Sequence, residues 1–297
     1  MAAGELTKRV AVAAVGIPLV ALALYLGRWA LGPALAILSA GAALEFYRLV
    51  QRQDIHALRV AGALAAAVMV LIPTVLPTVS AAAPLLWSGT FLFVLLIAVL
   101  TIWQRGPDGR PFLTLAVTVA GALIPAAAMG HAIFLRHLPL TPPDAAPVAW
   151  STLVGFSLVA YALLVTWATD SAAFFAGKRW GKRRLIPRVS PKKTVVGAVA
   201  GLVGGLLAGW VVGHLVLANW LGVPLHPLAA ALGGLLLSAV SQVGDLAASV
   251  WKREAGVKDS GTFFPGHGGI IDRMDSLLFT IPGTYWLMWI MLGGGGA

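Results

Sequence analysis

Long apolar runs separated by short polar segments form the main pattern of this sequence. A transmembrane helix needs about 20 apolar residues, and runs of that length recur along the chain. They predict an all-α, polytopic integral membrane protein with about nine spanning helices. The predicted helices cover residues 10–26, 29–47, 60–80, 83–103, 112–135, 150–175, 195–218, 228–251 and 276–292. The first run could be mistaken for a signal peptide, but further apolar runs follow at once, so an uncleaved helix is expected.

Composition supports this fold class. Of 297 residues, 59% are hydrophobic and 11% are charged, whereas about 25% are charged in soluble domains, so an ordinary soluble enzyme is excluded. The net charge of +10 favours anionic lipid headgroups, phosphates or nucleotides as partners. The chain has no cysteine, which excludes disulfides, thiolate nucleophiles and metal sites with cysteine ligands.

The basic residues also predict an orientation, because short loops rich in Lys and Arg stay in the cytoplasm. With the N-terminus inside, 19 of the 21 basic residues fall on the inner side, and only Arg28 and Arg136 fall outside. The result is the same, seven against two, when the loops 176–194 and 252–275 are left out of the count. We therefore predict a cytoplasmic N-terminus, an outer C-terminus and two long cytoplasmic loops.

Polar chemistry is concentrated in the C-terminal half. Residues 1–150 are expected to form a transmembrane scaffold, and residues 151–297 a catalytic transmembrane region with the loops 176–194 and 252–275. The glycine-rich tail 293–297 is expected to have no function.

Three acidic residues fall within predicted spans, where a carboxylate usually marks a functional site. Glu45 precedes Arg48 by three residues, so a local ion pair is the favoured interpretation. Asp170 is either a site residue or an interfacial partner of the basic residues that follow it. Asp245 lies on a polar stripe formed by Ser238, Ser241, Asp245, Ser249 and Lys252. That stripe should face the protein interior, and a site is favoured over helix packing because the stripe leads into the loop 252–275.

The loop 252–275 combines glycines, carboxylates and cations, as a site for a magnesium–nucleotide complex requires. Gly266, Gly268 and Gly269 would allow backbone N–H groups to approach an anion. Mg²⁺ prefers oxygen ligands and bridges carboxylates to phosphates. The candidate carboxylates are Asp245, Asp259, Asp272 and Asp275, and the candidate cations are Lys252, Arg253, Lys258 and Arg273. Zinc is not expected, because His267 is the only histidine here and cysteine is absent.

The other loop, residues 177–197, holds eight basic residues and no acid. Residues 182–184 are interpreted as an electrostatic contact with anionic lipid. Ser190, Lys192, Lys193 and Thr194 lie where the seventh helix begins, with Thr194 as its N-cap, and they predict a phosphate site. Nucleic acid is a poor partner, because no aromatic stacking platform is apparent in the loops.

These residues resemble the phosphatidate cytidylyltransferases, also called CDP-diacylglycerol synthases. The resemblance is strongest over residues 165–275, with a signature that runs from Ser249 through Lys258, Pro265 and Asp272 to Asp275. Trp251 departs from the family, which usually has a smaller apolar residue there, and only packing should be affected. The upstream elements Trp167, Asp170, Gly177, residues 190–194, Gly197 and Gly244 also match, and residues 45–47 match more weakly.

The resemblance implies that CTP and phosphatidic acid react to give CDP-diacylglycerol and pyrophosphate, in a homodimer in the inner cell membrane with its site on the cytoplasmic side. It matches Asp245 and Asp272 to paired metal ligands for Mg²⁺, with Asp275 as a third candidate ligand, and leaves a second cation such as K⁺ open. Catalysis is assigned to Asp245, Asp272, Lys252, Lys258 and Arg273. Substrate binding is assigned to Asp170, Ser190, Lys192, Lys193, Thr194, Ser249, Arg253, Asp259, His267, Gly268 and Gly269, and His267 would bind phosphate or cap the loop.

Two other functions are compatible with parts of the pattern. An ion-coupled transporter would use Asp170 and Asp245 but leave the glycine-rich loop without a role. A CTP-dependent lipid kinase would phosphorylate an alcohol and release CDP.

Overall fold

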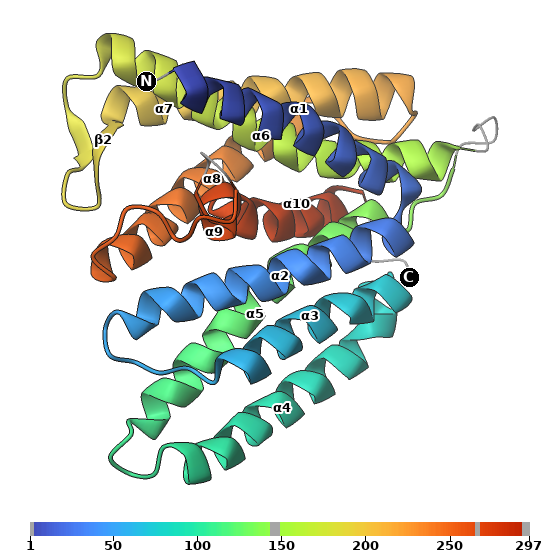
Figure 1. Cartoon of the computed structure of the whole chain (residues 1–297). Helices are drawn as coiled ribbons and strands as arrows, with labels where there is room; N and C mark the ends of the chain where they lie inside the picture. Colours follow the sequence, from blue (N-terminus) through green and yellow to red (C-terminus); the bar gives the residue numbers. More distant parts are fainter. Residues whose placement is uncertain (1–2, 143–148, 265–267, 293–297) are drawn as a thin grey trace. The chain divides into compact units, whose positions relative to one another are not determined.

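The computed structural model describes residues 3–142, 149–264 and 268–292, with only the backbone for residues 3–13. Its helices are α1 (Ala3–Leu26), α2 (Arg28–Gln51), α3 (Arg59–Val75), α4 (Val79–Gln104), α5 (Pro111–Arg136), α6 (Trp150–Trp180), α7 (Val195–Trp210), α8 (Pro227–Glu254), α9 (Ile270–Met274) and α10 (Leu277–Met291). A π-helix, η1 (Val211–Trp220), continues α7, and strands β1 (Arg184–Ile186) and β2 (Ser190–Thr194) form a hairpin (Figure 1). The candidate residues Pro265, Gly266 and His267 and the tail 293–297 lie outside the described residues.

The predicted helix positions are confirmed, with local differences. Six helices in the described chain are long and apolar enough to cross a membrane: α2, α4, α5, α6, α7 together with η1, and α8. The protein is therefore a multi-pass, largely helical membrane protein. The described apolar parts of α1 and α3, Ala14–Leu26 and Arg59–Val75, are shorter, so the total of nine spans stays a prediction.

Two local elements were not predicted. The basic loop 177–197 contains the antiparallel hairpin, in which Arg184 pairs with Thr194 and Ile186 with Ser190. The segment before the last span forms the short helix α9, and α10 begins only after Ser276. Both elements lie in polar segments, where hydropathy carries no helix or strand period.

The chain forms two compact units. The first comprises residues 1–134 and 251–274, and the second comprises residues 135–250 and 275–297. The proposed division into a scaffold half and a catalytic half concerns function and stays a prediction.

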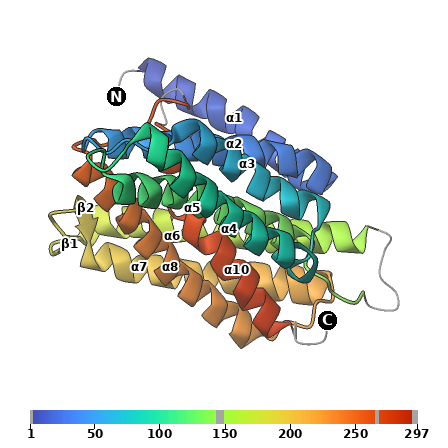
Figure 2. The same ribbon diagram turned by 90° about the horizontal axis from the view of Figure 1, so that it is seen from below.

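The first unit packs α2 against α3, which run side by side in both views, and α4 against α3 (Figures 1 and 2). Ala43, Tyr47, Val70 and Ile97 are fully buried in its core. The Tyr47 hydroxyl donates to Thr118 O at 2.7 Å, so the one polar atom of this core aromatic has a partner.

The second unit is built on α6 and α7, with the hairpin at one end of both helices (Figure 2). Small residues let its helices approach closely, as is common between membrane helices. A Cβ atom on Gly209 would lie 2.6 Å from Gly234 Cα, so α7 and α8 meet backbone to backbone. The Tyr161 hydroxyl donates to Ala230 O at 2.7 Å and links α6 to α8.

Candidate functional site

The hairpin places its lysines directly before the N-terminus of α7. Thr194 Oγ1 accepts a hydrogen bond from Gly197 N at 3.1 Å, which confirms Thr194 as the N-cap. Val195 N donates to Arg183 O at 3.0 Å, so the hairpin is tied to the first turn of the helix. Because Ser190 also pairs with Ile186 at the other end of β2, Lys192 and Lys193 lie on a strand that is held at both ends.

A cavity of about 620 Å³ lies in the second unit among α6, the hairpin, α7 and α8. Its charged lining consists of Asp170, Lys178, Arg184, Lys192, Lys193 and Asp245. Gly177, Gly181 and Gly197 also line it, and a Cβ on Gly197 would lie 2.7 Å from Ala173 O, so only glycine permits this helix contact. The cavity combines four cations with two carboxylates, which suits a metal–polyphosphate ligand.

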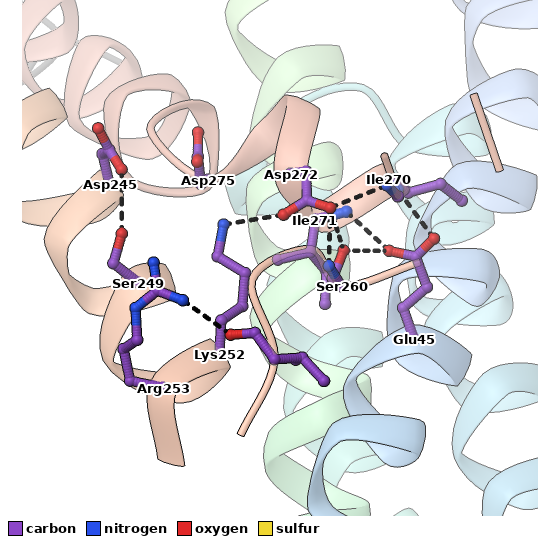
Figure 3. Close-up of polar contacts among 12 residues, drawn as sticks. Glu45, Asp245, Ser249, Lys252, Arg253, Ser260, Ile270, Ile271, Asp272 and Asp275 are labelled. Atoms are coloured by element: carbon purple, nitrogen blue, oxygen red, sulfur yellow. Dashed lines mark hydrogen bonds and ion pairs between the residues drawn. The ribbon is translucent and has the colours of Figure 1, made fainter. Parts of the chain in front are cut away.

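Within this cavity one ion pair joins the hairpin to α8. Lys193 Nζ lies 2.7 Å from Asp245 Oδ2, and the two side chains are 26% and 31% exposed. The Ser249 hydroxyl, one turn further along α8, donates to Asp245 Oδ1 at 3.4 Å (Figure 3). Three predicted site residues are thus in contact, and both oxygens of Asp245 are engaged.

The predicted polar stripe is confirmed as an inward-facing stripe on a single helix. Ser238, Ser241, Ser249 and Lys252 are all buried on α8. Ser238 donates to Gly201 O at 2.9 Å, while Ser241 Oγ has no partner among the described residues. Residues spaced three and four apart therefore lie on one face of α8, as they do in any α-helix.

The first unit contains a second group of predicted site residues, centred on Asp272 (Figure 3). Lys252 Nζ donates to Asp272 Oδ1 at 2.8 Å, and both side chains are buried. Asp272 Oδ2 accepts from Ser260 N at 2.7 Å, Gly269 N at 2.9 Å and Ser260 Oγ at 3.1 Å. Burial acts to raise the pKa of Asp272, but the Lys252 hydrogen bond and charge and the two backbone donors outweigh it, so the pKa lies below its ordinary value.

Glu45 belongs to this group and does not form the local ion pair that its spacing from Arg48 predicted. Its carboxylate accepts from Ile270 N at 2.9 Å, Ile271 N at 3.0 Å and Ser260 Oγ at 2.8 Å. That prediction was wrong because the turn that begins α9 supplies backbone donors, which need no side-chain entropy to hold in place.

The glycine-rich loop also differs from the predicted phosphate nest. The N–H of Gly269 is directed at Asp272, and the next two N–H groups are directed at Glu45. Gly268 has φ +83°, a conformation that favours glycine. Three consecutive amides therefore bind carboxylates of the protein itself, and phosphate binding by Gly268 and Gly269 stays a prediction.

The other predicted residues of this region are more exposed. Lys258, Asp259 and Arg273 are exposed in the first unit. Arg253 is also exposed and donates to Val257 O at 2.9 Å, closing the end of α8. In the second unit, Asp275 Oδ1 accepts from Ser276 N at 2.8 Å just before α10. Among the described residues, no group of three or more Asp, Glu, His or Cys could hold a metal by itself.

Residues 7–291 match the model of the cytidylyltransferase family. The chain belongs to this family. A phosphatidate cytidylyltransferase of Synechocystis sp. is 33% identical over 306 residues, covering 96% of this chain and 97% of that protein.

Two further relatives of this protein align with only part of its sequence. The phosphatidate cytidylyltransferase of Bacillus subtilis is 45% identical over 142 residues, or 45% of this chain and 48% of that protein. The uncharacterized protein YnbB of Escherichia coli is 35% identical over 169 residues, or 57% of this chain and 52% of that protein. The alignments thus span about half the length of these two relatives.

Two further site residues, Arg184 and Ser260, were misassigned or missed from the sequence, whereas the expectation for Trp251 agrees with the structure. Arg184 lines the cavity, although it was interpreted, with residues 182 and 183, as a lipid contact. Ser260 is buried between two carboxylates, and only its place in the signature could have indicated a role. Trp251 packs edge-on against Phe46 of α2 with ring centroids 5.8 Å apart, in agreement with a packing role.

Proposed function

We propose that this protein transfers the cytidylyl group of CTP to phosphatidic acid, giving CDP-diacylglycerol and pyrophosphate. The observation that carries the proposal is the cavity in which Lys192, Lys193 and Arg184 face Asp170 and Asp245. It lies between helices that are apolar enough to span a membrane, where a lipid phosphate and a nucleotide can meet. Family membership and the names of the relatives support the same reaction.

The chemistry needs positioning more than a strong base. A phosphatidate oxygen attacks the α-phosphorus of CTP, a new P–O bond forms, and the bond to the bridging oxygen breaks as pyrophosphate leaves with its electron pair. The attacking phosphate is already anionic near neutral pH. The cationic side chains of the cavity therefore contribute mainly by holding two anions together and by neutralising charge in the transition state.

The donor set of the cavity fits Mg²⁺ that enters with the nucleotide. Mg²⁺ usually takes one or two carboxylates together with waters and substrate phosphates, and Asp170 and Asp245 line the same cavity. When bound, the ion would offset the negative charge of the phosphates. In this proposal Asp245 would help to hold the cation, and Lys193, which now pairs with Asp245, would bind a phosphate oxygen. The pairing of Asp245 with Asp272, a role for Asp275 and a second cation such as K⁺ stay predictions from the resemblance.

We further propose that the site opens to the cytoplasm of a bacterial inner membrane and that the protein is a homodimer. The charge distribution of the sequence supports the orientation, and the family resemblance supports the dimer. Chemical cross-linking of the protein in its native membrane, followed by electrophoresis, tests for a band at twice the mass of the chain.

Purified protein in phosphatidic acid micelles with MgCl₂ tests the reaction directly. With CTP labelled at the α-phosphate, the label should enter the lipid and unlabelled pyrophosphate should be released. With the label at the γ-phosphate, none should enter the lipid. Removing Mg²⁺ with EDTA should stop both processes, and Asp245→Asn and Asp272→Asn should each abolish turnover.

The same experiment separates the alternatives. A lipid kinase would transfer the γ-label and release CDP, and a transporter would label no lipid in either case. Wild-type turnover in Asp245→Asn or Asp272→Asn would remove that residue from the proposed metal site.

A further inference from the structure

Glu45 is a buried carboxylate of the N-terminal half that contacts the signature segment directly. It lies on α2, only 2% of it is exposed, and it makes no ion pair with any described residue. Its two oxygens instead accept the Ile270, Ile271 and Ser260 hydrogen bonds given above (Figure 3). A buried polar group without such partners would carry a large desolvation cost, and these donors offset it.

The Ser260 hydroxyl connects Glu45 to the residues proposed for catalysis. Its oxygen lies 2.8 Å from Glu45 Oε2 and 3.1 Å from Asp272 Oδ2. A hydroxyl has one proton to donate, so the carboxylates of Glu45 and Asp272 share the proton of this one hydroxyl. Asp272 also binds Lys252, so Glu45, Ser260, Asp272 and Lys252 form one chain of hydrogen bonds within the first unit.

We propose that Glu45 is a positioning residue of the cytidylyl transfer. It fixes Ser260, Ile270 and Ile271 to a rigid helix and thereby sets the direction of Asp272 and Lys252. The inference rests on the proposed function, and it gives the N-terminal half a part in the reaction beyond that of a scaffold.

The local geometry requires a carboxylate at this position. Three donors converge on Glu45, and a glutamine would present an amide NH₂ group to at least one of them. The neighbouring backbone leaves little room for adjustment: a Cβ on Gly261 would lie 2.6 Å from Glu45 Oε1, and one on Gly269 would overlap Oε2. Aspartate keeps the charge but is one methylene shorter, so it should restore part of the function.

The test compares Glu45→Gln and Glu45→Asp with the wild type in kcat, in KM for CTP and in thermal unfolding. Groups that orient a catalytic residue typically contribute about 10–100-fold to activity, so we expect Glu45→Gln to lower kcat by about that factor. KM for CTP should change less than about threefold, because the nucleotide-binding cations are not touched. Glu45→Asp should recover at least part of kcat.

A matched control is available on the same helix. Ser39 is fully buried on α2, and its hydroxyl donates to Ala66 O of α3 at 3.3 Å rather than to Ser260, Ile270 or Ile271. Ser39→Ala should keep wild-type kcat. A loss of kcat in Ser39→Ala equal to that in Glu45→Gln would overturn the proposal, because any buried change on α2 would then have the same effect.

A double-mutant cycle separates positioning from general destabilisation. Ser260→Ala removes the shared hydroxyl. The fold loss of kcat in the double variant Ser260→Ala/Glu45→Gln should therefore be smaller than the product of the fold losses in the two single variants. Independent effects, or wild-type kcat in folded Glu45→Gln, would contradict the inference. If Glu45→Gln does not fold, the cycle is run with Glu45→Asp. An inactive wild type would instead contradict the proposed function itself.

Discussion

Lys193 on strand β2 and Asp245 on helix α8 form an ion pair of 2.7 Å that lines the cavity of the second unit. The pair joins the basic hairpin to the polar stripe, two features that are separate in the sequence. Each partner is about a quarter to a third exposed, so an incoming ligand can reach both. In the proposed reaction, a substrate phosphate and a cation would take the places of these two protein charges.

Lys193→Met should weaken nucleotide binding. Loss of a charge-assisted hydrogen bond costs about 1.5–3 kcal/mol, so KM for CTP should rise by about 10–100-fold while the fold is kept. Steady-state kinetics in phosphatidic acid micelles give this value. Lys182→Met is the matched control, because Lys182 is exposed on the same loop and does not line the cavity. Equal KM values for the two variants would remove Lys193 from the binding site.

Two neighbouring arginines of the hairpin should behave differently. Arg184 lines the cavity, and its Nη1 donates to Lys192 O at 3.5 Å, whereas the exposed side chain of Arg183 does not line the cavity. Arg184→Met should raise KM for CTP or for phosphatidic acid by about tenfold, as expected for one lost charged hydrogen bond. Arg183→Met should leave both values unchanged. If both arginines only contact lipid, the two variants will give the same kinetics.

Lys252→Met should destabilise the protein. It leaves the Asp272 carboxylate buried without its cation, and breaking such a pair costs about 3–5 kcal/mol. Thermal unfolding in detergent, followed by intrinsic tryptophan fluorescence, should show a clearly lower Tm. Lys258→Met, at an exposed position of the same unit, should keep the wild-type Tm. An unchanged Tm in Lys252→Met would show that the pair does not contribute to stability.

The orientation can be tested by cysteine labelling, because the natural chain contains no cysteine. Arg188→Cys places a thiol on the hairpin, on the predicted inner side, and Thr141→Cys places one between α5 and α6, on the predicted outer side. Both positions are exposed. A maleimide that does not cross membranes should label only Thr141→Cys in intact spheroplasts and both variants after lysis. The reverse pattern would invert the proposed topology.

Local features of the sequence predicted local structure well. The apolar runs gave the helix positions, because the length and hydropathy of a spanning helix are properties of consecutive residues. Thr194 could be identified as an N-cap because it contacts Gly197, only three residues away. The inward face of α8 followed from helical spacing alone.

Contacts between distant segments could not be predicted in the same way. Glu45 was paired with Arg48 because only neighbours are visible in a sequence, whereas its real partners are Ser260, Ile270 and Ile271. The signature indicated a functional role for Lys252 and Asp272 but not that they form an ion pair with each other. No spacing rule distinguishes Arg184, which lines a cavity, from the basic residues beside it.

The sequence by itself determined that this is a helical membrane protein of the cytidylyltransferase type, since apolar length, charge distribution and a signature of fixed spacing are written along the chain. Only the tertiary structure decided which charges meet. The free energy of a buried charge depends on the donors and cations packed around it, and these come from segments far apart in the chain. Asp245 therefore lies beside Lys193, Asp272 beside Lys252, and Glu45 against the amides that precede Asp272.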